Sequence, residues 1–430
     1  MRKNNSFAVL GDICYAVAAD DLKTVPHAYA VCENGLCAGV FKALPDRFSD
    51  IEVIDMSGRL ITPGFADLHL HAPQYSYRGT GMDLELLEWL DSITFPEEAR
   101  YADPEYAQKA YGLFVDDLRR SPTTRASVFA TVHTDATLVL MNMLKSSGMG
   151  AYVGKVNMDR NSPDVYRETT EESVKETCRW LKACETAGFL ADDSIVRPII
   201  TPRFVPSCTD ELMRELGKIV EKDKLPVQSH LSENISEVEW VKQLEPEAKG
   251  YADAYDRYGL FGTESQTVMA HCIYLRDDEI DLMSQRGVFA AHSPQSNMNL
   301  RSGIAPMRKL LEKGVKCGLA SDLAGGSSIN MFKAVTDAIQ VSKLYWRLTD
   351  ETKAPLSFTE SFYLATKGGG SFFGNVGSFE EGYEFDLLAI DDGMAKTSLE
   401  FEIEQRLERT MYLGHAGFIK AKFVAGRRIL

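Results

Sequence analysis

Two histidines separated by one leucine, His69 and His71, end the apolar segment Phe65–His71. Because side chains alternate between the two faces of a strand, both imidazoles would point the same way and could bind one metal ion. Imidazole nitrogens suit zinc, and a catalytic zinc site adds one or two distant ligands while leaving a position open for water. The segment therefore predicts part of a catalytic metal site.

Three further side chains, His230, His271 and Asp322, each end a short apolar run that is typical of a buried strand. A single histidine in such a position is more often a packing residue whose ring is satisfied by its neighbours. This chain has only eight histidines, however, and four of them end strand-like runs. We therefore expect His69, His71, His230 and Asp322 to bind one ion. Zinc is the expected metal, although such ligands also accept iron, manganese or cobalt.

The middle of the chain alternates strand-like runs with amphipathic stretches, as a parallel sheet with crossover helices requires. Strands are expected at 62–71, 127–134, 151–158, 196–204, 226–231, 267–272, 287–292 and 316–321. Helices are expected over stretches such as 171–187, 210–222 and 236–244. Eight strands predict an α/β fold of the TIM type, a (β/α)8 barrel, in which chemistry lies at the C-terminal ends of the strands. His71, His230, His271 and Asp322 would then end strands one, five, six and eight.

Both ends of the chain carry shorter alternating runs. Glu33-Asn34-Gly35 is a turn signal between two such runs and predicts a hairpin. Near the C-terminus, 385–390 is typical of a strand and 424–429 of a hairpin tip. We therefore predict a discontinuous β-domain from residues 1–61 and 375–430, and a catalytic barrel domain from residues 62–374.

Length, charge and cysteine usage narrow the function classes. At 430 residues the chain is long enough for one large barrel with an accessory part. A net charge of −15 and an isoelectric point near 5.1 argue against a nucleic-acid polymer or an anionic membrane as partner, whereas a neutral small molecule is allowed. The eight cysteines show no CxxC spacing. We therefore expect reduced thiols and a cytoplasmic protein.

A secretory alternative stays open at the N-terminus. Met1-Arg2-Lys3 is followed by the apolar run Phe7–Leu10 and then by an Ala-x-Ala pattern, which is the outline of a signal peptide. Asp12 interrupts the apolar stretch, and the same residues also fit a first strand. No run approaches the ~18 apolar residues that a membrane span needs.

Longer motifs make the chain similar to the amidohydrolase superfamily and, within it, to the guanine deaminase family. The superfamily resemblance rests on the His69-Leu70-His71 strand, on His230 and His271, and on Ser321-Asp322. The finer resemblance rests on His71-Ala72-Pro73-Gln74-Tyr75, Leu86-Leu87-Glu88-Trp89-Leu90 with Thr94-Phe95-Pro96-Glu97, Thr201-Pro202-Arg203-Phe204, and His230-Leu231-Ser232-Glu233-Asn234. The similarity covers most of the chain. It implies a distorted eight-stranded barrel, a β-sandwich from both ends, one zinc ion per chain and a homodimer.

Carried onto this sequence, the resemblance implies roles residue by residue. The metal ligands would be His69, His71, His230 and Asp322. The catalytic set would be Glu233, which shuttles protons, with Asp322 and His271 beside the reacting water. The base would be held by Gln74, Arg203 and Phe204 and would also lie against His71, His230, Glu233 and Asp322. One departure is Ser293, where relatives often carry cysteine before the proline, which leaves the role of that loop open.

The activity that the resemblance implies is hydrolysis of guanine to xanthine and ammonia, a step of purine catabolism. Zinc lowers the pKa of a bound water toward about 7 and so supplies a nucleophile. Glu233 stands three residues beyond a ligand, so its carboxylate can reach the water and the ring without competing for the ion. The alternative for Glu233 is an acidic residue in the solvated first turn of a helix.

Purine choice is expected to depend on Arg203. Its guanidinium offers donors in a fixed fork, and guanine presents two adjacent acceptors, O6 and N7, where adenine has an amino group at position six. Because a buried donor would then face another donor, the binding free energy of adenine should be less favourable by about 1–3 kcal/mol or more. Gln74 can donate and accept at once, and Phe204 offers a stacking face. The alternative for Arg203-Phe204 is a surface charge beside a core aromatic residue.

Other functions remain open at this point. The nearest is hydrolysis of another amino-heterocycle, such as 8-oxoguanine, a triazine or a nucleoside, by the same barrel. A second is a non-catalytic assembly protein, although such proteins typically lose ligands that this chain keeps. Trp89 and Phe95 are candidates for a lid, but an aromatic stripe at helical spacing is more often core. Glu97-Glu98 is expected on a solvated face.

Overall fold

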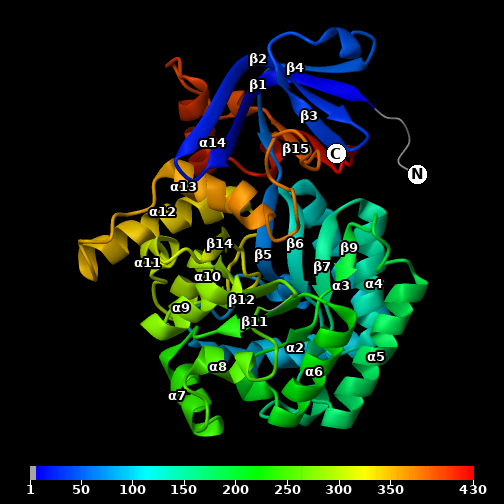
Figure 1. Cartoon of the computed structure of the whole chain (residues 1–430), viewed down its shortest axis with the longest axis vertical. Helices are drawn as coiled ribbons and strands as arrows, with labels where there is room; N and C mark the ends of the chain where they lie inside the picture. Colours follow the sequence, from blue (N-terminus) through cyan, green and yellow to red (C-terminus); the bar gives the residue numbers. More distant parts are fainter. Residues whose placement is uncertain (1–5, 263) are drawn as a thin grey trace.

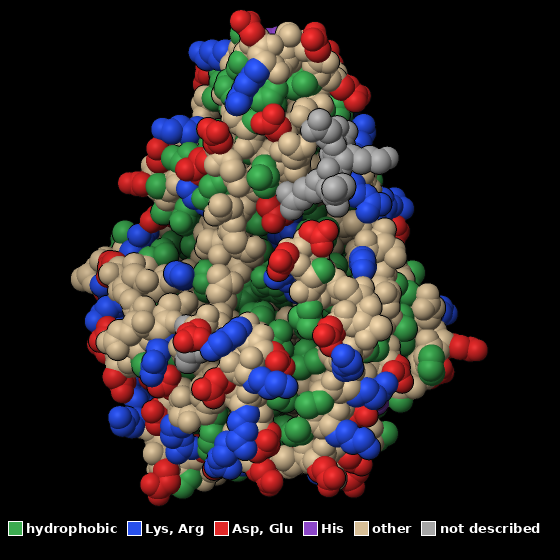
Figure 2. Space-filling view, turned by 45° about the vertical axis from the view of Figure 1, so that its right-hand side comes forward, with side chains coloured by type: hydrophobic (Ala, Val, Ile, Leu, Met, Phe, Trp, Pro, Cys, Tyr) green, Lys and Arg blue, Asp and Glu red, His purple; other side chains and the backbone are tan. Residues whose placement is uncertain are grey.

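The computed structural model describes residues 6–262 and 264–430. Figure 1 shows a sheet built from both ends of the chain at the top and, below it, strands surrounded by helices. Acidic and basic side chains are intermixed over the face shown in Figure 2. Among the described residues, none of the helices has the length and apolar character that crossing a membrane requires.

The lower part contains two four-stranded parallel sheets. The first has the order β5 (Phe65–His71), β6 (Thr123–Phe129), β7 (Gly150–Gly154) and β9 (Val196–Pro198). The second has the order β11 (Val227–Leu231), β12 (Thr267–His271), β13 (Phe289–His292) and β14 (Lys316–Leu319). Two short strands, β8 (Val156–Asn157) and β10 (Thr201–Pro202), also pair in parallel. The expected parallel arrangement is therefore confirmed.

Backbone hydrogen bonds connect the two sheets at both edges. On one side, Gln228 N–H donates to the carbonyl oxygen of Ile200 at 3.0 Å. On the other side, Asp322 N–H donates to the carbonyl oxygen of His69 at 2.9 Å, and His71 N–H donates to that of Leu323 at 2.8 Å. The C-terminal ends of the first and last strands are therefore neighbours, so side chains far apart in sequence meet there.

Helices lie between successive strands. The described helices are α1 (Leu86–Trp89), α2 (Phe95–Ala99), α3 (Pro104–Arg120), α4 (Thr134–Ser147), α5 (Thr170–Thr186), α6 (Asp210–Asp223), α7 (Ile235–Leu244), α8 (Tyr251–Asp256), α9 (Asp277–Arg286), α10 (Pro294–Asn299), α11 (Met307–Glu312), α12 (Met331–Leu348), α13 (Phe358–Tyr363) and α14 (Ile403–Leu413). Side chains of Thr169, Thr209 and Asn234 cap α5, α6 and α7. Because each cap satisfies a backbone N–H of the first turn, it fixes where the helix begins. The three helices expected from periodicity are confirmed.

The second strand of the lower part differs from the expectation. It was expected at 127–134 and is found at 123–129. Arg125 makes this segment look polar, yet its guanidinium is buried and binds Asp386 at 2.7 and 2.9 Å and Glu384 at 2.7 Å. A buried charge is stable when it is paired. This ion-pair cluster also connects the lower part to the C-terminal segment.

Both ends of the chain share one seven-stranded sheet. Its order is β17 (Arg427–Arg428), β16 (Ile419–Val424), β15 (Leu387–Ile390), β4 (Glu52–Pro63), β1 (Phe7–Ala18), β2 (Asp21–Glu33) and β3 (Leu36–Phe41). The expected hairpin at Asn34-Gly35 is confirmed, and both residues have the positive φ, 56° and 85°, that a tight hairpin turn needs. A β-sandwich packing of this sheet stays a prediction.

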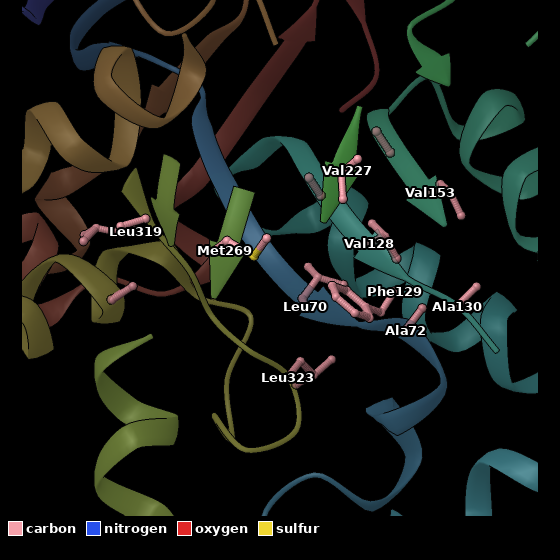
Figure 3. Packing of buried hydrophobic residues seen from close by; sticks show 14 of the residues in the cluster. Leu70, Ala72, Val128, Phe129, Ala130, Val153, Val227, Met269, Leu319 and Leu323 are labelled. Carbon is pink, nitrogen blue, oxygen red and sulfur yellow. The ribbon is translucent and has the colours of Figure 1, made fainter. Parts of the chain in front are cut away.

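Apolar packing supports both parts. The rings of Phe385 and Phe423 lie 5.4 and 5.3 Å from that of Phe7 on one face of the terminal sheet. In the lower part the parallel strands are almost entirely buried, as expected for strands covered by helices. Figure 3 shows Leu70 and Phe129 side by side in this core. The strands of the lower part are therefore held in place by a continuous apolar core.

Candidate active site

Four side chains expected to bind a metal converge at the C-terminal ends of the parallel strands. Nε2 of His71 lies 3.2 Å from Nε2 of His230. Oδ1 of Asp322 lies 3.1 Å from Nε2 of His69 and 3.7 Å from Nε2 of His71. Ligand atoms around a tetrahedral zinc with bonds of roughly 2.1 Å are about 3.4 Å apart. The observed spacing fits that arrangement.

The protonation of these groups also fits a cation. Burial, followed by the neighbouring rings, lowers the pKa of His71 and His230 well below the usual value, so both are neutral. Nδ1 of His230 donates to the carbonyl oxygen of Arg203 at 2.6 Å, which leaves a lone pair on Nε2. Nε2 of His69 is buried, and the Asp322 carboxylate lies 3.1 Å from it. Lone pairs and a carboxylate therefore face one another, and a cation between them would satisfy all of them.

Asp322 stays ionised in this cluster. Burial opposes its charge, but the rings of His69, His271 and His71 lower the pKa of Asp322 well below its usual value. Its backbone has a φ of 45°, and His271 has a φ of 72°. Residues other than glycine adopt such left-handed conformations at a cost of about 1–3 kcal/mol, and such strain clusters at functional sites. The two side chains therefore point into the cluster from strained backbone conformations.

His271 and Glu233 lie beside the cluster. Nε2 of His271 is 3.4 Å from Oε2 of Glu233 and 3.7 Å from Oδ2 of Asp322. Nδ1 of His271 donates to Oδ1 of Asn297 at 2.9 Å, so its Nε2 faces the two carboxylates. Burial, followed by the charges of Asp322 and Glu237, raises the pKa of Glu233 well above its usual range. A carboxyl group with a raised pKa can both take and give a proton near neutral pH.

The helix after β11 explains the position of Glu233. Asn234, not Glu233, caps α7, and its side chain accepts from Ser236 N–H at 2.8 Å. The Glu237 side chain accepts from the N–H groups of Glu233 and Asn234 at 2.8 and 3.1 Å. Glu233 therefore stands before the helix, 3% exposed, with Ser302 donating to its Oε1 at 3.3 Å. The solvated alternative for Glu233 is wrong.

One cavity joins the polar cluster to the residues expected to hold a base. It encloses about 390 Å³ of space, part of which is open to solvent. The lining consists of His71, Gln74, Leu86, Trp89, Leu90, Arg203, Phe204, His230, Glu233, His271, Leu300, Asp322 and Gly325. All three expected base-binding residues, Gln74, Arg203 and Phe204, are therefore in the wall. His69 lies behind the lining, where it contacts Asp322.

Part of the wall is apolar and comes from the segment after β5. Leu86 and Trp89 of α1 and Leu90 line the cavity and are each less than a tenth exposed. Phe95 does not line the cavity as a lid residue would. Its ring centroid instead lies 5.0 Å from the guanidinium carbon of Arg203. Trp89 thus lines the cavity, whereas Phe95 packs against Arg203, which lines it.

Glu98 corrects the expectation for the pair Glu97-Glu98. The Glu98 side chain is fully buried and accepts hydrogen bonds from Arg203 and Gln74. Glu98 lies one helical turn after Phe95 and therefore on the same buried face of α2. This spacing is the sequence signal that could have identified it, but a carboxylate is buried only where a partner compensates its charge.

Two other residues at the site have weaker sequence signals. The Phe129 ring lies 4.7 to 4.9 Å from the rings of His69, His71 and His230, so it holds three imidazoles from one side. Asn297 is 1% exposed and fixes the His271 ring. Both residues act on histidines distant in sequence, so neither could be assigned from its local pattern.

Three other polar side chains, His133, Lys155 and Asp67, lie outside the cavity. His133 precedes α4 as its N-cap residue, and its ring faces Tyr166. Lys155 pairs with Glu168 at 2.7 Å. Asp67 lies on β5, two residues before His69, where it accepts hydrogen bonds from the N–H and the hydroxyl of Ser321 at 2.9 and 2.5 Å. None of these three lines the cavity among the described residues.

Comparisons with known proteins agree with this geometry. Residues 60–429 match the model of the amidohydrolase family. The chain is 39% identical to a guanine deaminase of Dictyostelium discoideum, covering 88% of this chain and 84% of that one, and 39% identical to one of Mus musculus, covering 89% and 86%. A crystal structure of guanine deaminase from C. acetobutylicum, with guanine bound in its active site, is 45% identical with a TM-score of 0.95, and covers 99% of this chain and 100% of its own. The E. coli guanine deaminase structure is 32% identical with a TM-score of 0.89, and covers 98% and 99%.

Proposed function

This chain belongs to the amidohydrolase family, in the branch that contains the guanine deaminases, and we propose that it converts guanine and water to xanthine and ammonia with one zinc ion per chain. The observation that carries this proposal is the shared cavity. Part of its lining is a histidine and carboxylate cluster suited to a metal, and another part offers hydrogen-bond donors and a stacking face suited to a flat base. A purine catabolic role follows from this reaction.

His69, His71, His230 and Asp322 would hold the zinc ion. When bound, zinc would supply an acidified water molecule at neutral pH. The neutral state of His71 and His230 supports this role, because a metal ligand must offer a lone pair. Phe129 and the carbonyl oxygen of Arg203 would hold the imidazole rings in orientation.

Glu233 would move the protons of the reaction. Its carboxylate takes a proton from the attacking water and gives it to a ring nitrogen as the water oxygen adds to the carbon that carries the amino group. A second proton transfer then allows the amino group to leave as ammonia. His271 and Asp322 would orient the water, since their Nε2 and Oδ2 atoms lie 3.7 Å apart and both face the same space. The raised pKa of Glu233 supports the shuttle role.

Recognition of guanine would depend on Arg203, Gln74 and Phe204. The N–H groups of Arg203 that do not bind Glu98 would donate to the adjacent acceptors O6 and N7, and Phe204 would stack on the ring. The amino group of adenine at position six would face these N–H donors, and no hydrogen bond could form. The small cavity also favours a free base over a nucleoside. Trp89 and the leucines beside it would exclude water from the reacting centre.

The remaining expectations are proposed together with this function. We propose that the two parallel sheets close into a distorted (β/α)8 barrel over residues 62–374, and that residues 1–61 and 375–430 form a β-sandwich domain. The family resemblance also supports a homodimer. Cysteine usage supports a cytoplasmic location.

The test is ammonia release by the purified, zinc-loaded protein across guanine, adenine, cytosine, adenosine and 8-oxoguanine. Guanine should be the preferred substrate, with one ammonia and one xanthine formed for each guanine consumed, followed by ultraviolet spectroscopy. Absence of ammonia release from guanine by protein that contains zinc would refute the proposed function. Preference for another member of the panel would reassign the substrate within the same chemistry.

A further inference from the structure

A fully buried carboxylate joins two of the residues that face the cavity. Oε2 of Glu98 accepts from Nη1 of Arg203 at 2.6 Å. Oε1 of Glu98 accepts from Nη2 of Arg203 at 3.1 Å and from Nε2 of Gln74 at 2.8 Å. Both oxygens of one carboxylate are therefore committed to two side chains that come from different strand ends.

We propose that Glu98 is a positioning residue that fixes Gln74 and Arg203 relative to each other, and thereby sets the hydrogen-bonding pattern that the base meets. This inference rests on the proposed function, because it concerns recognition of the base in the same cavity. Glu98 does not line the cavity itself. It acts through the two residues that do.

The Gln74 amide is held at both ends. Its Nε2 donates to Glu98, and its Oε1 accepts from Ala324 N–H at 2.9 Å. Rotating the amide by half a turn would bring its oxygen against the carboxylate and its NH2 group against the Ala324 N–H. An acceptor would then face an acceptor at Glu98, and a donor would face a donor at Ala324. The Gln74 amide therefore has one orientation, which fixes where its remaining N–H and its remaining lone pair point.

Arg203 is held at its edge and on its face by the same short helix. Glu98 receives two parallel hydrogen bonds from the guanidinium edge, and the Phe95 ring, one turn earlier in α2, covers its face at 5.0 Å. Bidentate pairing of this kind fixes the plane of the guanidinium as well as its distance. The remaining N–H donors of Arg203 are thereby aimed in one direction.

Glu98 also balances the charge of the buried arginine. The Arg203 side chain is 3% exposed, and that of Glu98 is fully buried. Because the two charges compensate each other, the wall offers directed donors without a net positive charge. Such a wall suits a neutral base and gives an anion no extra attraction.

The decisive variant is Glu98→Asp, which keeps the charge but shortens the side chain by one methylene. The shorter carboxylate cannot reach both partners, and misplacement by about 1 Å can lower activity roughly 100-fold. We therefore expect kcat/KM for guanine to fall about 100-fold, with a higher KM and weaker product inhibition by xanthine. Zinc content and the unfolding temperature should stay close to those of the wild type. Glu98→Gln, which keeps the length but replaces an acceptor with a donor, should show the same loss.

Glu97→Asp is the matched control, because Glu97 is the adjacent residue of α2 and its carboxylate binds Arg100 and Tyr106, neither of which lines the cavity. Its kcat/KM should stay within roughly threefold of the wild type. Wild-type kcat/KM and xanthine inhibition in a stably folded Glu98→Asp protein would overturn the positioning role. Failure of both Glu98 variants to fold would also overturn it, in favour of a purely structural role. An inactive wild type would instead refute the proposed function.

Discussion

The Nδ1–H of His230 donates a hydrogen bond to the backbone carbonyl oxygen of Arg203 at 2.6 Å. One contact thus joins a proposed metal ligand to a proposed base-binding residue. It fixes the His230 ring with its Nε2 lone pair toward the other ligands. Ser229, the residue before His230, donates from its hydroxyl to the carbonyl oxygen of Pro202 at 2.7 Å. The two functions of the cavity are therefore built on adjacent backbone.

His230→Ala should lose the metal. The substitution removes one of four ligands, so zinc affinity should fall by more than the roughly 10–100-fold that loss of an outer hydrogen-bond partner causes. Zinc per chain after dialysis, measured by atomic absorption, checks this. His415→Ala, at an exposed histidine, is the control and should retain zinc. Full zinc content in the His230 variant would contradict the ligand assignment.

Glu233→Gln should separate metal binding from catalysis. The amide keeps the size of the side chain but cannot take a proton from water, so kcat should fall by about 10²–10⁴-fold while zinc remains bound. Steady-state kinetics and metal content measured on the same sample check this. Glu239→Gln, on the exposed side of α7, should remain active. Turnover at the wild-type rate in Glu233→Gln would refute the proton-shuttle role.

The pH dependence of activity should report the environment of Glu233. Burial raises the pKa of Glu233 well above the ordinary value of 4.5, so this carboxyl becomes protonated at a higher pH than an exposed glutamate. Only the ionised form can take the proton of water. As the pH falls, kcat/KM should therefore decline at a pH clearly above 4.5. A profile that stays flat down to the ordinary glutamate range would be inconsistent with this environment.

Arg125→Met should destabilise the fold. It would leave the buried Asp386 without its main partner, and breaking a buried pair in this way costs about 3–5 kcal/mol of unfolding free energy. Urea unfolding followed by circular dichroism checks this. Arg120→Met removes an exposed pair with Asp116 and should cost less than about 1 kcal/mol. Equal midpoints for the two variants would contradict the role given to Arg125.

Sequence reasoning identified the residues whose signal is local. The His69-x-His71 spacing predicts a shared face because a strand has a period of two, and the structure brings both rings together. The helices α5, α6 and α7 could also be predicted, because the amphipathic pattern of each lies within one segment. The histidines at the strand end and the three helices could therefore be named in advance.

Residues whose state depends on distant partners could not be found in this way. Glu98 looked like a solvated acid because its partner Arg203 lies 105 residues away. Arg125 lies in a buried strand that was expected at 127–134 instead of 123–129, and the partner that allows its burial, Asp386, lies 261 residues away. Asn297 carries no local sign of its contact with His271. Burial of a polar side chain is decided by the group that compensates it, and a single sequence does not show which groups meet.

The most direct test of the account is a zinc titration of the metal-free protein with guanine turnover measured at each point. Chelator-treated protein should be inactive, and activity should return in proportion to bound zinc until it saturates at one ion per chain. The His230→Ala protein should not recover over the same range. Full guanine deamination by protein free of zinc and of other divalent metals would contradict the central claim that His69, His71, His230 and Asp322 hold the ion on which the reaction depends.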